Sequence, residues 1–388
     1  MSGGTSPIYL DHNATTPADP RVVEAMIPYF TGVFGNPSSV EHTHGHAAQT
    51  AVAEARSKVA RALGARDNEI VFTGSCTEAN NIAILGSARA QPDRRHVVTT
   101  AIEHPAVLEP MRELARQGYE LTLLPVDEFG QVDPGQVADA LRDDTLLVSV
   151  MGANNEVGTI QPIAAIGALC EARGALFHAD LAQLMAHGSV DVAASNVHLA
   201  SVSGHKAYGP KGVGALYARS RSPRARLSAV GFGGGQERGL RSGTLNVPLI
   251  VGMAEALAIC AKEGRPEGER LTAMCRAFGE RVMASVDGVQ LNGHPTERIP
   301  GNFSLSIAGV EPLALMHRLR DVASFSASSA CATDKVETSH VLLAMFGDTA
   351  RARQAFRVSP GRFTTAADMQ IFTVALIDTV GELRRIAA

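Results

Sequence analysis

The first two thirds of the chain alternate short apolar runs with segments that place apolar residues at helical spacing. In one such segment Val52, Ala55 and Val59 share a face, and Gly64 follows as a stop signal. The strand-like runs are Glu69–Thr73, His96–Ala101, Glu120–Pro125, Thr145–Met151, Ala175–Ala179 and Leu199–Ser203. This alternation predicts an α/β protein whose mostly parallel sheet is sandwiched by helices and buried on both faces.

The length of the chain and one polar stretch predict a second, smaller domain. At 388 residues the chain exceeds one typical domain. The stretch Lys262–Arg270 is polar and contains Gly264, Pro266 and Gly268, as expected of a boundary. We expect a large domain over residues 18–262 and a smaller α+β domain built from residues 1–17 and 263–388.

Charge and cysteine usage narrow the class of protein. The net charge is −4, so the totals show no large basic footprint for nucleic acid. The sequence shows no secretory signal and no run of roughly 20 apolar residues for a bilayer. The five cysteines include no C-x-x-C pair, which argues against a disulfide framework or a zinc site. We expect a cytoplasmic protein without bound metal, membrane or direct nucleic-acid contact. One basic cluster is interpreted as a solvated turn around Pro223: Arg219, Arg221, Arg224 and Arg226.

Polar side chains gather where the expected strands end. Thr77, His104, Asn155, Asp180 and the segment Ser203–Lys206 each fall at or just after a strand-like run. In open α/β sheets, ligands bind beyond the carboxyl ends of the strands. The same edge of the sheet therefore collects a hydroxyl, an imidazole, an amide, a carboxylate and an amine. That combination is what a cofactor site needs.

A lysine and an aspartate in this set point to pyridoxal 5′-phosphate (PLP). Lys206 follows a strand among small residues, where partial desolvation lowers the pKa of its amine and frees it to attack an aldehyde. PLP works as an electron sink only when its pyridine nitrogen stays protonated, which a buried carboxylate secures. Asp180 lies about 25 residues earlier in the chain, at another strand end, which suits this cofactor. Gln183 is placed to reach the ring oxygen.

The segment Thr73–Glu78 predicts a phosphate site. It follows a strand-like run, consists of small residues and precedes an apolar helix, so helical amides would face an anion. Neither a Walker pattern nor a dinucleotide fingerprint is present, since Gly231–Gly235 lacks the third glycine and a clear following helix. A nicotinamide dehydrogenase is therefore a weak alternative.

Motifs spread along nearly the whole chain carry a family resemblance. The chain resembles the NifS/IscS-like cysteine desulfurases, which belong to the class V aminotransferases and share the fold-type I architecture. The matching segments are Leu10–Pro17, Gly35–Ser39, Thr77–Asn81, Glu103–His104, Asn154–Gly158, Gly204–Lys206, Arg241–Thr244 and Arg357–Phe363. The resemblance implies a PLP enzyme that converts L-cysteine to L-alanine and passes the sulfur to an acceptor or scaffold protein.

The resemblance also implies catalytic roles for single residues. Lys206 bonds to the PLP aldehyde, Asp180 pairs with the pyridine nitrogen, and His104 stacks on the ring and moves protons. Arg357, with Asn155, grips the carboxylate of the substrate, a task that suits a planar guanidinium.

The remaining implied contacts concern the ring oxygen and the phosphate. Asn155 and Gln183 address the ring oxygen, and Cys76 lies in the phosphate turn as a further cofactor contact. Thr244 is expected to reach in from the other subunit of a homodimer. The phosphate-binding side chains of the same subunit are Thr77, Ser203 and His205.

Cys331 decides between the reactions of this fold. It lies in the small, polar segment Ser324–Asp334, which predicts an exposed and mobile loop. Cys170 and Cys260 have apolar neighbours and are expected to be buried. The loop matches the long-loop branch of the family, in which the catalytic cysteine takes the sulfur as a persulfide and delivers it directly. This feature argues against aminotransfer and selenocysteine lysis, the nearest alternatives, and the intact Lys206 and Asp180 argue against a scaffold without catalysis.

The chain departs from the family pattern in its phosphate turn and near the end of the motif region. Gly74-Ser75-Cys76-Thr77 stands where Ser-Gly-Ala-Thr is usual, and one extra residue precedes His42. Pro360 replaces a usual Leu or Ile, and Ser328 a common Gly. Iron–sulfur assembly, tRNA thiolation and sulfur modification of DNA all remain open as destinations of the sulfur.

Overall fold

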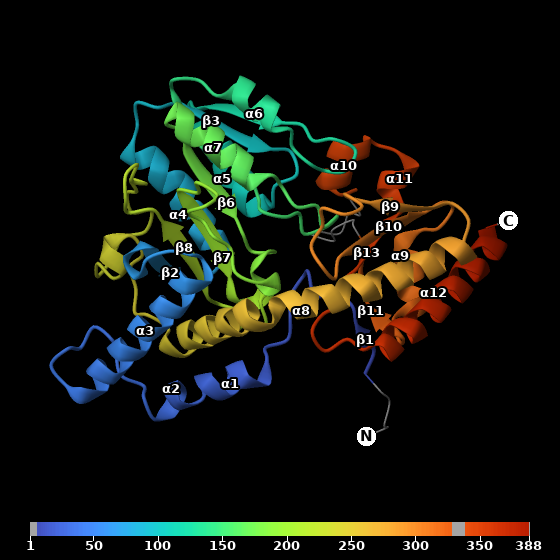
Figure 1. The fold of residues 1–388 in the computed structure, drawn as a ribbon, viewed down its shortest axis with the longest axis horizontal. Helices are drawn as coiled ribbons and strands as arrows, with labels where there is room; N and C mark the ends of the chain where they lie inside the picture. The colour runs from blue at the N-terminus through green and yellow to red at the C-terminus, as the bar shows by residue number, and fades with distance from the viewer. Residues whose placement is uncertain (1–5, 328–337, 388) are drawn as a thin grey trace.

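The computed structural model describes residues 6–327 and 338–387. Its centre is a seven-stranded sheet in which only β8 runs antiparallel to its two neighbours (Figure 1). The strand order is β2 (Ile70–Thr73), β8 (Gly214–Ala218), β7 (Leu199–Ser203), β6 (Leu176–Asp180), β5 (Thr145–Ser149), β3 (His96–Thr100) and β4 (Glu120–Leu124). The six strands expected from the pattern are confirmed to within two residues at each end, whereas the pattern does not predict β8.

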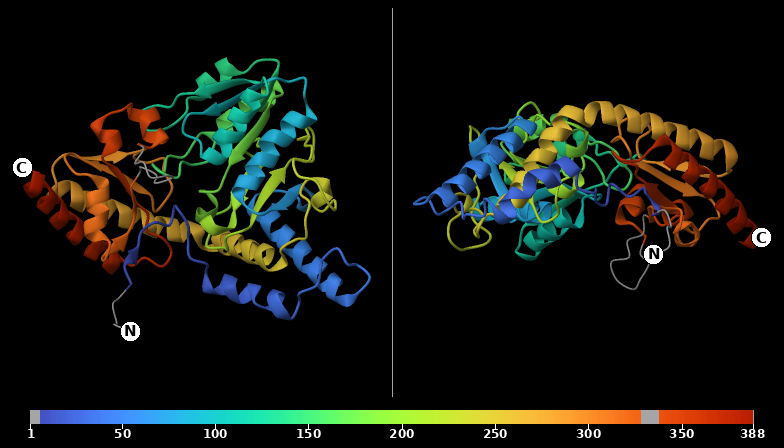
Figure 2. Two further views of the ribbon diagram at one scale, coloured as in Figure 1. Left: turned by 180° about the vertical axis from the view of Figure 1, so that it is seen from behind. Right: turned by 90° about the horizontal axis from the view of Figure 1, so that it is seen from below.

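Helices cover both faces of this sheet, as expected for a sheet buried on both sides (Figure 2). Two separate apolar clusters define the two faces. On one face lie α3 (Thr43–Ala62), α6 (Pro134–Ala140), α7 (Ile163–Arg173) and the first half of α8 (Val247–Ser285). On the other lie α4 (Cys76–Ala90) and α5 (Pro105–Arg116). The short helices α1 (Pro20–Met26) and α2 (Pro28–Thr31) lie against α8. The class predicted from the sequence is confirmed.

The polar stretch Lys262–Arg270 is helical and lies in the middle of α8, a single helix of 39 residues. The domain boundary expected there falls within a continuous helix, in which the glycines allow close packing against other segments. A Cβ on Gly264 would lie 2.7 Å from the backbone of Gly188, and one on Gly268 would lie 3.0 Å from Pro300. The stretch nevertheless separates two halves of α8 that pack into different apolar cores.

The second core lies around a four-stranded antiparallel sheet in the order β12 (Ser326–Ala327), β13 (Ala355–Val358), β10 (Phe303–Ile307) and β9 (Val289–Asn292). The N-terminal strand β1 (Ile8–Tyr9) pairs with β11 (Ala323–Ser324), which ties the chain start to this unit. We propose residues 18–262 as a large domain and residues 1–17 and 263–388 as a small one. Besides the second half of α8, the small domain contains the helices α9 (Pro312–Leu319), α10 (His340–Phe346), α11 (Ala350–Arg353) and α12 (Ala366–Ala387).

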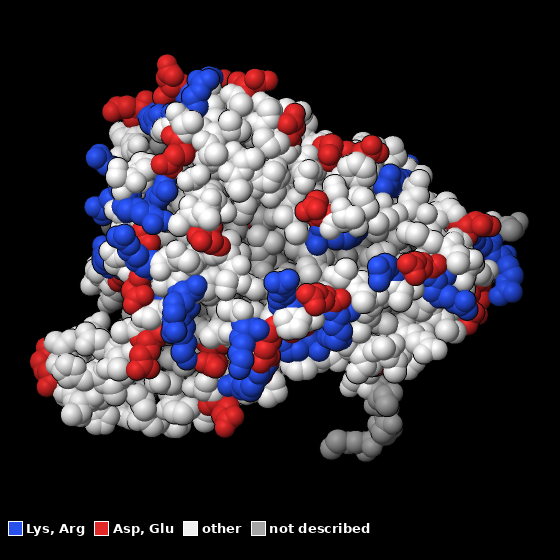
Figure 3. Space-filling view, viewed as in Figure 1, with Lys and Arg blue, Asp and Glu red and all other residues white. Residues whose placement is uncertain are grey.

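Charged side chains of both signs alternate along the face that α8 crosses (Figure 3). The arginine cluster near Pro223 is not one solvated turn, since Arg219 is buried and its guanidinium lies 2.7 Å from Glu171. Arg224 and Arg226 are exposed, as expected. Within the described ranges, no helix has the length and apolar character needed to cross a membrane.

Candidate active site

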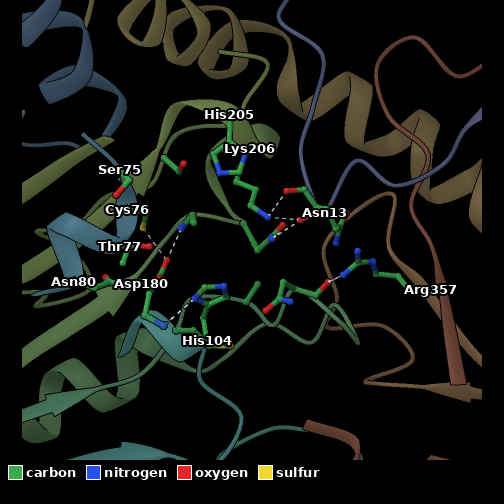
Figure 4. Close-up of a pocket in the computed structure, with 18 residues that line it drawn as sticks. Asn13, Ser75, Cys76, Thr77, Asn80, His104, Asp180, His205, Lys206 and Arg357 are labelled. Atoms are coloured by element: carbon green, nitrogen blue, oxygen red, sulfur yellow. Dashed lines mark hydrogen bonds between the residues drawn. The ribbon is translucent and has the colours of Figure 1, made fainter. Parts of the chain in front are cut away.

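A cavity of about 400 Å³ opens where β5, β6 and β7 end and α4 begins (Figure 4). It lies at the carboxyl edge of the sheet, where the sequence places the candidate chemistry. Ten of the predicted site residues line it: Cys76, Thr77, His104, Asn155, Asp180, Gln183, Ser203, His205, Lys206 and Arg357. The convergence of side chains from six separate segments makes this cavity the candidate active site.

Lys206 ends the short 3₁₀ turn Gly204–Lys206 that directly follows β7. Its Nζ donates hydrogen bonds to the carbonyl oxygens of Asn13 at 2.5 Å and of Ala14 at 2.9 Å. Burial, and after it the nearby charge of Arg357, lower the pKa of the Lys206 amine to about 8. The amine is therefore neutral and nucleophilic near neutral pH far more often than that of an ordinary lysine.

Asp180 is the last residue of β6, and its carboxylate is held by three donors. The Ala182 amide donates to Oδ1 at 3.0 Å, and the Asn80 side-chain amide donates to Oδ2 at 2.8 Å. The Cys76 thiol lies 3.5 Å from Oδ1. Hydrogen bonds of this kind fix the orientation of the carboxylate.

The N-terminus of α4 forms a cup beside Lys206. Ser75 caps the helix by accepting from the Glu78 amide at 3.1 Å, so the amides of Cys76 and Thr77 are the first without a helical acceptor. Strand β8 comes so close that a Cβ on Gly214 would lie 2.6 Å from the Ser75 carbonyl carbon. A helix of 15 residues with free N-terminal amides facing a cavity is suited to an anion such as phosphate.

His104 caps the start of α5, which fixes its ring. The Ala106 amide donates to Nδ1 at 3.0 Å, so Nδ1 acts as an acceptor and Nε2 is the nitrogen left to carry and exchange a proton. Burial lowers the pKa of the imidazole, and the charge of Asp180 counteracts part of this effect. The neutral ring is therefore the prevailing form at neutral pH.

Arg357 approaches the cavity from β13, in the second unit. Its guanidinium donates to the Asn155 carbonyl at 2.7 Å and to Asp11 at 2.6 Å, with Ser326 at 3.3 Å. The buried Nε has no partner among the described residues. A buried cation with an unused donor at the wall of a cavity is suited to a carboxylate ligand.

The N-terminal segment forms one wall of the site, although its residues are not predicted as site residues from the sequence. Asn13 and Ala14 line the cavity, and the Asn13 carbonyl also accepts from Gln183 at 3.0 Å. The His205 ring contacts the Thr15 hydroxyl at 3.1 Å. Asn80 is missed as well. Asn13 and Asn80 both lie in segments that carry the family resemblance, so that resemblance could have identified them as site residues.

Two predicted residues are not part of the cavity described here. Thr244 is exposed in the loop before α8 and does not line the cavity of its own chain. Cys331 lies outside the described residues. Cys170 and Cys260 are fully buried, as predicted.

The donor set of the cavity fits PLP. Lys206 offers an amine for the aldehyde, Asp180 a carboxylate for the pyridine nitrogen and the start of α4 a cup for the phosphate. Two buried polar atoms at this site, Asn13 Nδ2 and Asn80 Oδ1, have no partner among the described residues. Unsatisfied buried polar groups are costly, and a polar ligand in the cavity would remove that cost.

Comparison with known proteins agrees with this assignment. The family profile described as aminotransferase class-V matches residues 8–372. The chain belongs to this family. It is 47% identical over 382 residues to the cysteine desulfurase IscS of Anaeromyxobacter sp. strain Fw109-5, covering 98% of this chain and 94% of the relative. PLP is the cofactor of the family, and the resemblance drawn from the sequence motifs is confirmed.

Solved structures give the same result for the fold. A NifS-like protein superposes with a TM-score of 0.89 at 34% identity, over 97% of this chain and 99% of the other. A structure described as SspA in complex with cysteine has a TM-score of 0.79 at 33% identity, over 93% of this chain and all of the other. The fold-type I architecture predicted from the sequence is confirmed.

Proposed function

We propose that the cysteine desulfurase reaction of this chain runs in the cavity around Lys206 and leaves the sulfur as a persulfide on Cys331. The class of reaction, PLP-dependent conversion of L-cysteine to L-alanine, follows from the family and from relatives that align over nearly the full length. The observation that carries the residue assignment is the placement of Lys206 and Asp180 in one cavity, with the helical cup of α4 beside them.

Three parts of the cavity would hold PLP. Lys206 would bond to the aldehyde, Asp180 would pair with the pyridine nitrogen, and Thr77, Ser203 and His205 would bind the phosphate. When bound in this way, PLP supplies an electron sink for bonds broken at the Cα and Cβ of the substrate. The remaining chemistry belongs to side chains of the chain.

Lys206 and His104 would transfer protons during the reaction. A Lys206 amine not bonded to PLP would accept the Cα proton, because its pKa, lowered to about 8, makes the neutral form accessible near neutral pH. The Asn13 and Ala14 carbonyls then accept from the protonated amine, as they accept from it here. His104 exchanges a proton through Nε2 because its Nδ1 is occupied by the Ala106 amide.

Substrate is oriented by Arg357 and Asn155. The guanidinium of Arg357, which reaches the cavity from β13, would bind the carboxylate of cysteine. The thiolate of Cys331 attacks the substrate Sγ and forms the S–S bond of a persulfide. The Cβ–Sγ bond breaks, its electron pair stays with the carbon portion, and protonation of Cβ yields alanine.

Two partners are part of the proposed function: a second copy of the chain and a protein that accepts the sulfur. A homodimer would bring Thr244 of a second copy to the phosphate, which accounts for its exposed position in this chain. An acceptor or scaffold protein would take the sulfur from Cys331 for iron–sulfur clusters, thiolated tRNA or DNA phosphorothioate. We place the reaction in the cytoplasm, where thiols stay reduced.

The test is a sulfide and alanine assay on the purified holoenzyme with L-cysteine and a reductant. We expect equimolar sulfide and alanine, lost in Cys331→Ser while the visible absorbance of bound PLP remains. Cys170→Ser, a change of a fully buried thiol that does not line the cavity, is the matched control and should retain turnover. Bound PLP without sulfide, even with candidate acceptors present, would contradict the proposal and point to another PLP reaction.

A further inference from the structure

The first turns of α4 present two side chains to the same carboxylate. Cys76 and Asn80 are four residues apart, so they lie on one face of the helix. The Asn80 amide donates to Oδ2 of Asp180 at 2.8 Å, and the Cys76 sulfur lies 3.5 Å from Oδ1. Figure 4 shows both side chains next to Asp180 at the wall of the cavity. Each carboxylate oxygen therefore has its own donor from α4.

The thiol of Cys76 is in a state to donate. Burial and then the charge of Asp180 raise its pKa well above the usual range, while the charge of Lys206 lowers it by less. The thiol thus keeps its proton at neutral pH. Asp180 is mostly buried and its other contacts are also donors, the Ala182 and Asn80 amides. A protonated thiol beside a carboxylate in such a setting donates a hydrogen bond.

We propose that Cys76 and Asn80 are positioning residues that act through Asp180. Each donates to a different oxygen of the carboxylate, and together they set how strongly Asp180 attracts the proton on the pyridine nitrogen of PLP. This inference rests on the proposed pairing of Asp180 with that nitrogen. A carboxylate that already accepts several hydrogen bonds is a weaker base, so the shared proton stays closer to the nitrogen.

The setting of Cys76 also distinguishes its role from the one proposed for Cys331. Cys76 is held as a neutral thiol and is a poor nucleophile, because the thiolate is the reactive form. Sulfur should therefore be found on Cys331 and not on Cys76 after turnover with L-cysteine. Alkylation followed by mass spectrometry of the peptides checks this point, and a persulfide on the Cys76 peptide would overturn the inference.

Infrared spectroscopy tests the thiol hydrogen bond directly on the holoenzyme. The S–H stretch absorbs where other protein groups do not, and donation to an acceptor moves it to lower frequency. We expect the native minus Cys76→Ala difference band to lie below the corresponding band for Cys170→Ala, a thiol fully buried in the apolar core. Asp180→Asn should move the Cys76 band back toward the Cys170 value. Coincident Cys76 and Cys170 bands would overturn the inference.

The effect on the cofactor is measured by NMR of isotope-labelled PLP at its pyridine nitrogen. Cys76→Ala and Asn80→Ala should move the signal in the direction of Asp180→Asn, by a smaller amount, whereas Cys76→Ser keeps a donor and should stay near the native value. An unchanged signal in Cys76→Ala beside a moved one in Asp180→Asn would overturn the role of Cys76 alone. An unchanged signal in Asp180→Asn would instead overturn the proposed pairing itself.

Discussion

The two ends of the cavity are built in different ways. At the cofactor end, Asp180 ends β6 and Lys206 lies in the turn that follows β7. The helix α4 begins just after β2, another strand of the same sheet. At the substrate end, Arg357 arrives from β13 of the second unit and pairs with Asp11, which lies 346 positions away in the chain. The backbone of the first end belongs to one sheet, although the Lys206 amine also donates to the Asn13 and Ala14 carbonyls of the second unit. At the second end the cation itself comes from the second unit.

This difference separates binding of the cofactor from recognition of the substrate. The backbone of Asp180 and Lys206 is held by a sheet that is covered on both faces, so its position depends little on the second unit. Arg357 depends on contacts with Asp11 and Asn155, which belong to other segments. We expect changes at the first end to affect the state of PLP and changes at the second to affect KM.

Lys206→Ala is expected to have the largest effect. It removes both the covalent attachment of PLP and the base for the Cα proton, so desulfuration should fall at least about a thousandfold. The visible absorbance of bound PLP should change to that of the free aldehyde, while the circular dichroism of the fold stays native. Sulfide release near the native rate would contradict the assignment of Lys206.

Arg357→Gln should act at the other end of the cavity. Loss of a charge-assisted hydrogen bond of about 1.5–3 kcal/mol lowers kcat/KM for L-cysteine roughly ten- to a hundredfold, mainly through KM. The PLP absorbance should stay native, which distinguishes this variant from Lys206→Ala. Arg116→Gln, a change of an exposed arginine on α5, is the control. An unchanged KM in Arg357→Gln would remove Arg357 from substrate binding.

Gly214→Ala tests the close approach of β8 to the phosphate cup. The added Cβ would lie 2.6 Å from the Ser75 carbonyl carbon and 2.8 Å from the Cys76 amide nitrogen, so the turn must shift. We expect a loss of about 1–3 kcal/mol in the free energy of unfolding and faster loss of PLP on dilution. Gly381→Ala on α12 has open space around its Cβ and should leave PLP retention unchanged.

The smallest expected effect is a shift in the pH midpoint of PLP uptake. The pKa of Lys206 is lowered to about 8, first by burial and then by Arg357. Only the neutral amine attacks the aldehyde, so the rate of PLP uptake by the apoprotein should rise with pH and level off above about 8. In Arg357→Gln the midpoint should move upward, because the lowering charge is gone. A midpoint that does not move would contradict coupling between the two ends.

Asp180 and Lys206 are predicted from the sequence for a physical reason, whereas the role of Arg357 is predicted only through the family resemblance. Asp180 and Lys206 follow short apolar runs, and strand ends of a parallel sheet converge on one edge whatever the loops do. The contacts of Asn13 and Asn80 depend on long-range packing, which periodicity along the chain does not contain. The helical structure of Lys262–Arg270 is not predicted for a similar reason. Its glycines allow close packing against Gly188 and Pro300, which are distant in the sequence.

Helix α8 makes the two units one cooperative structure. Its first half contributes Met253 and Leu257 to the core under the central sheet, and its second half contributes Phe278 and Val282 to the other core. Melting either core would expose one half of the helix and remove the packing that keeps the other half ordered, since most helical stability comes from tertiary contacts. Unfolding of one unit alone is therefore penalised, and the chain should lose both cores in a single thermal transition.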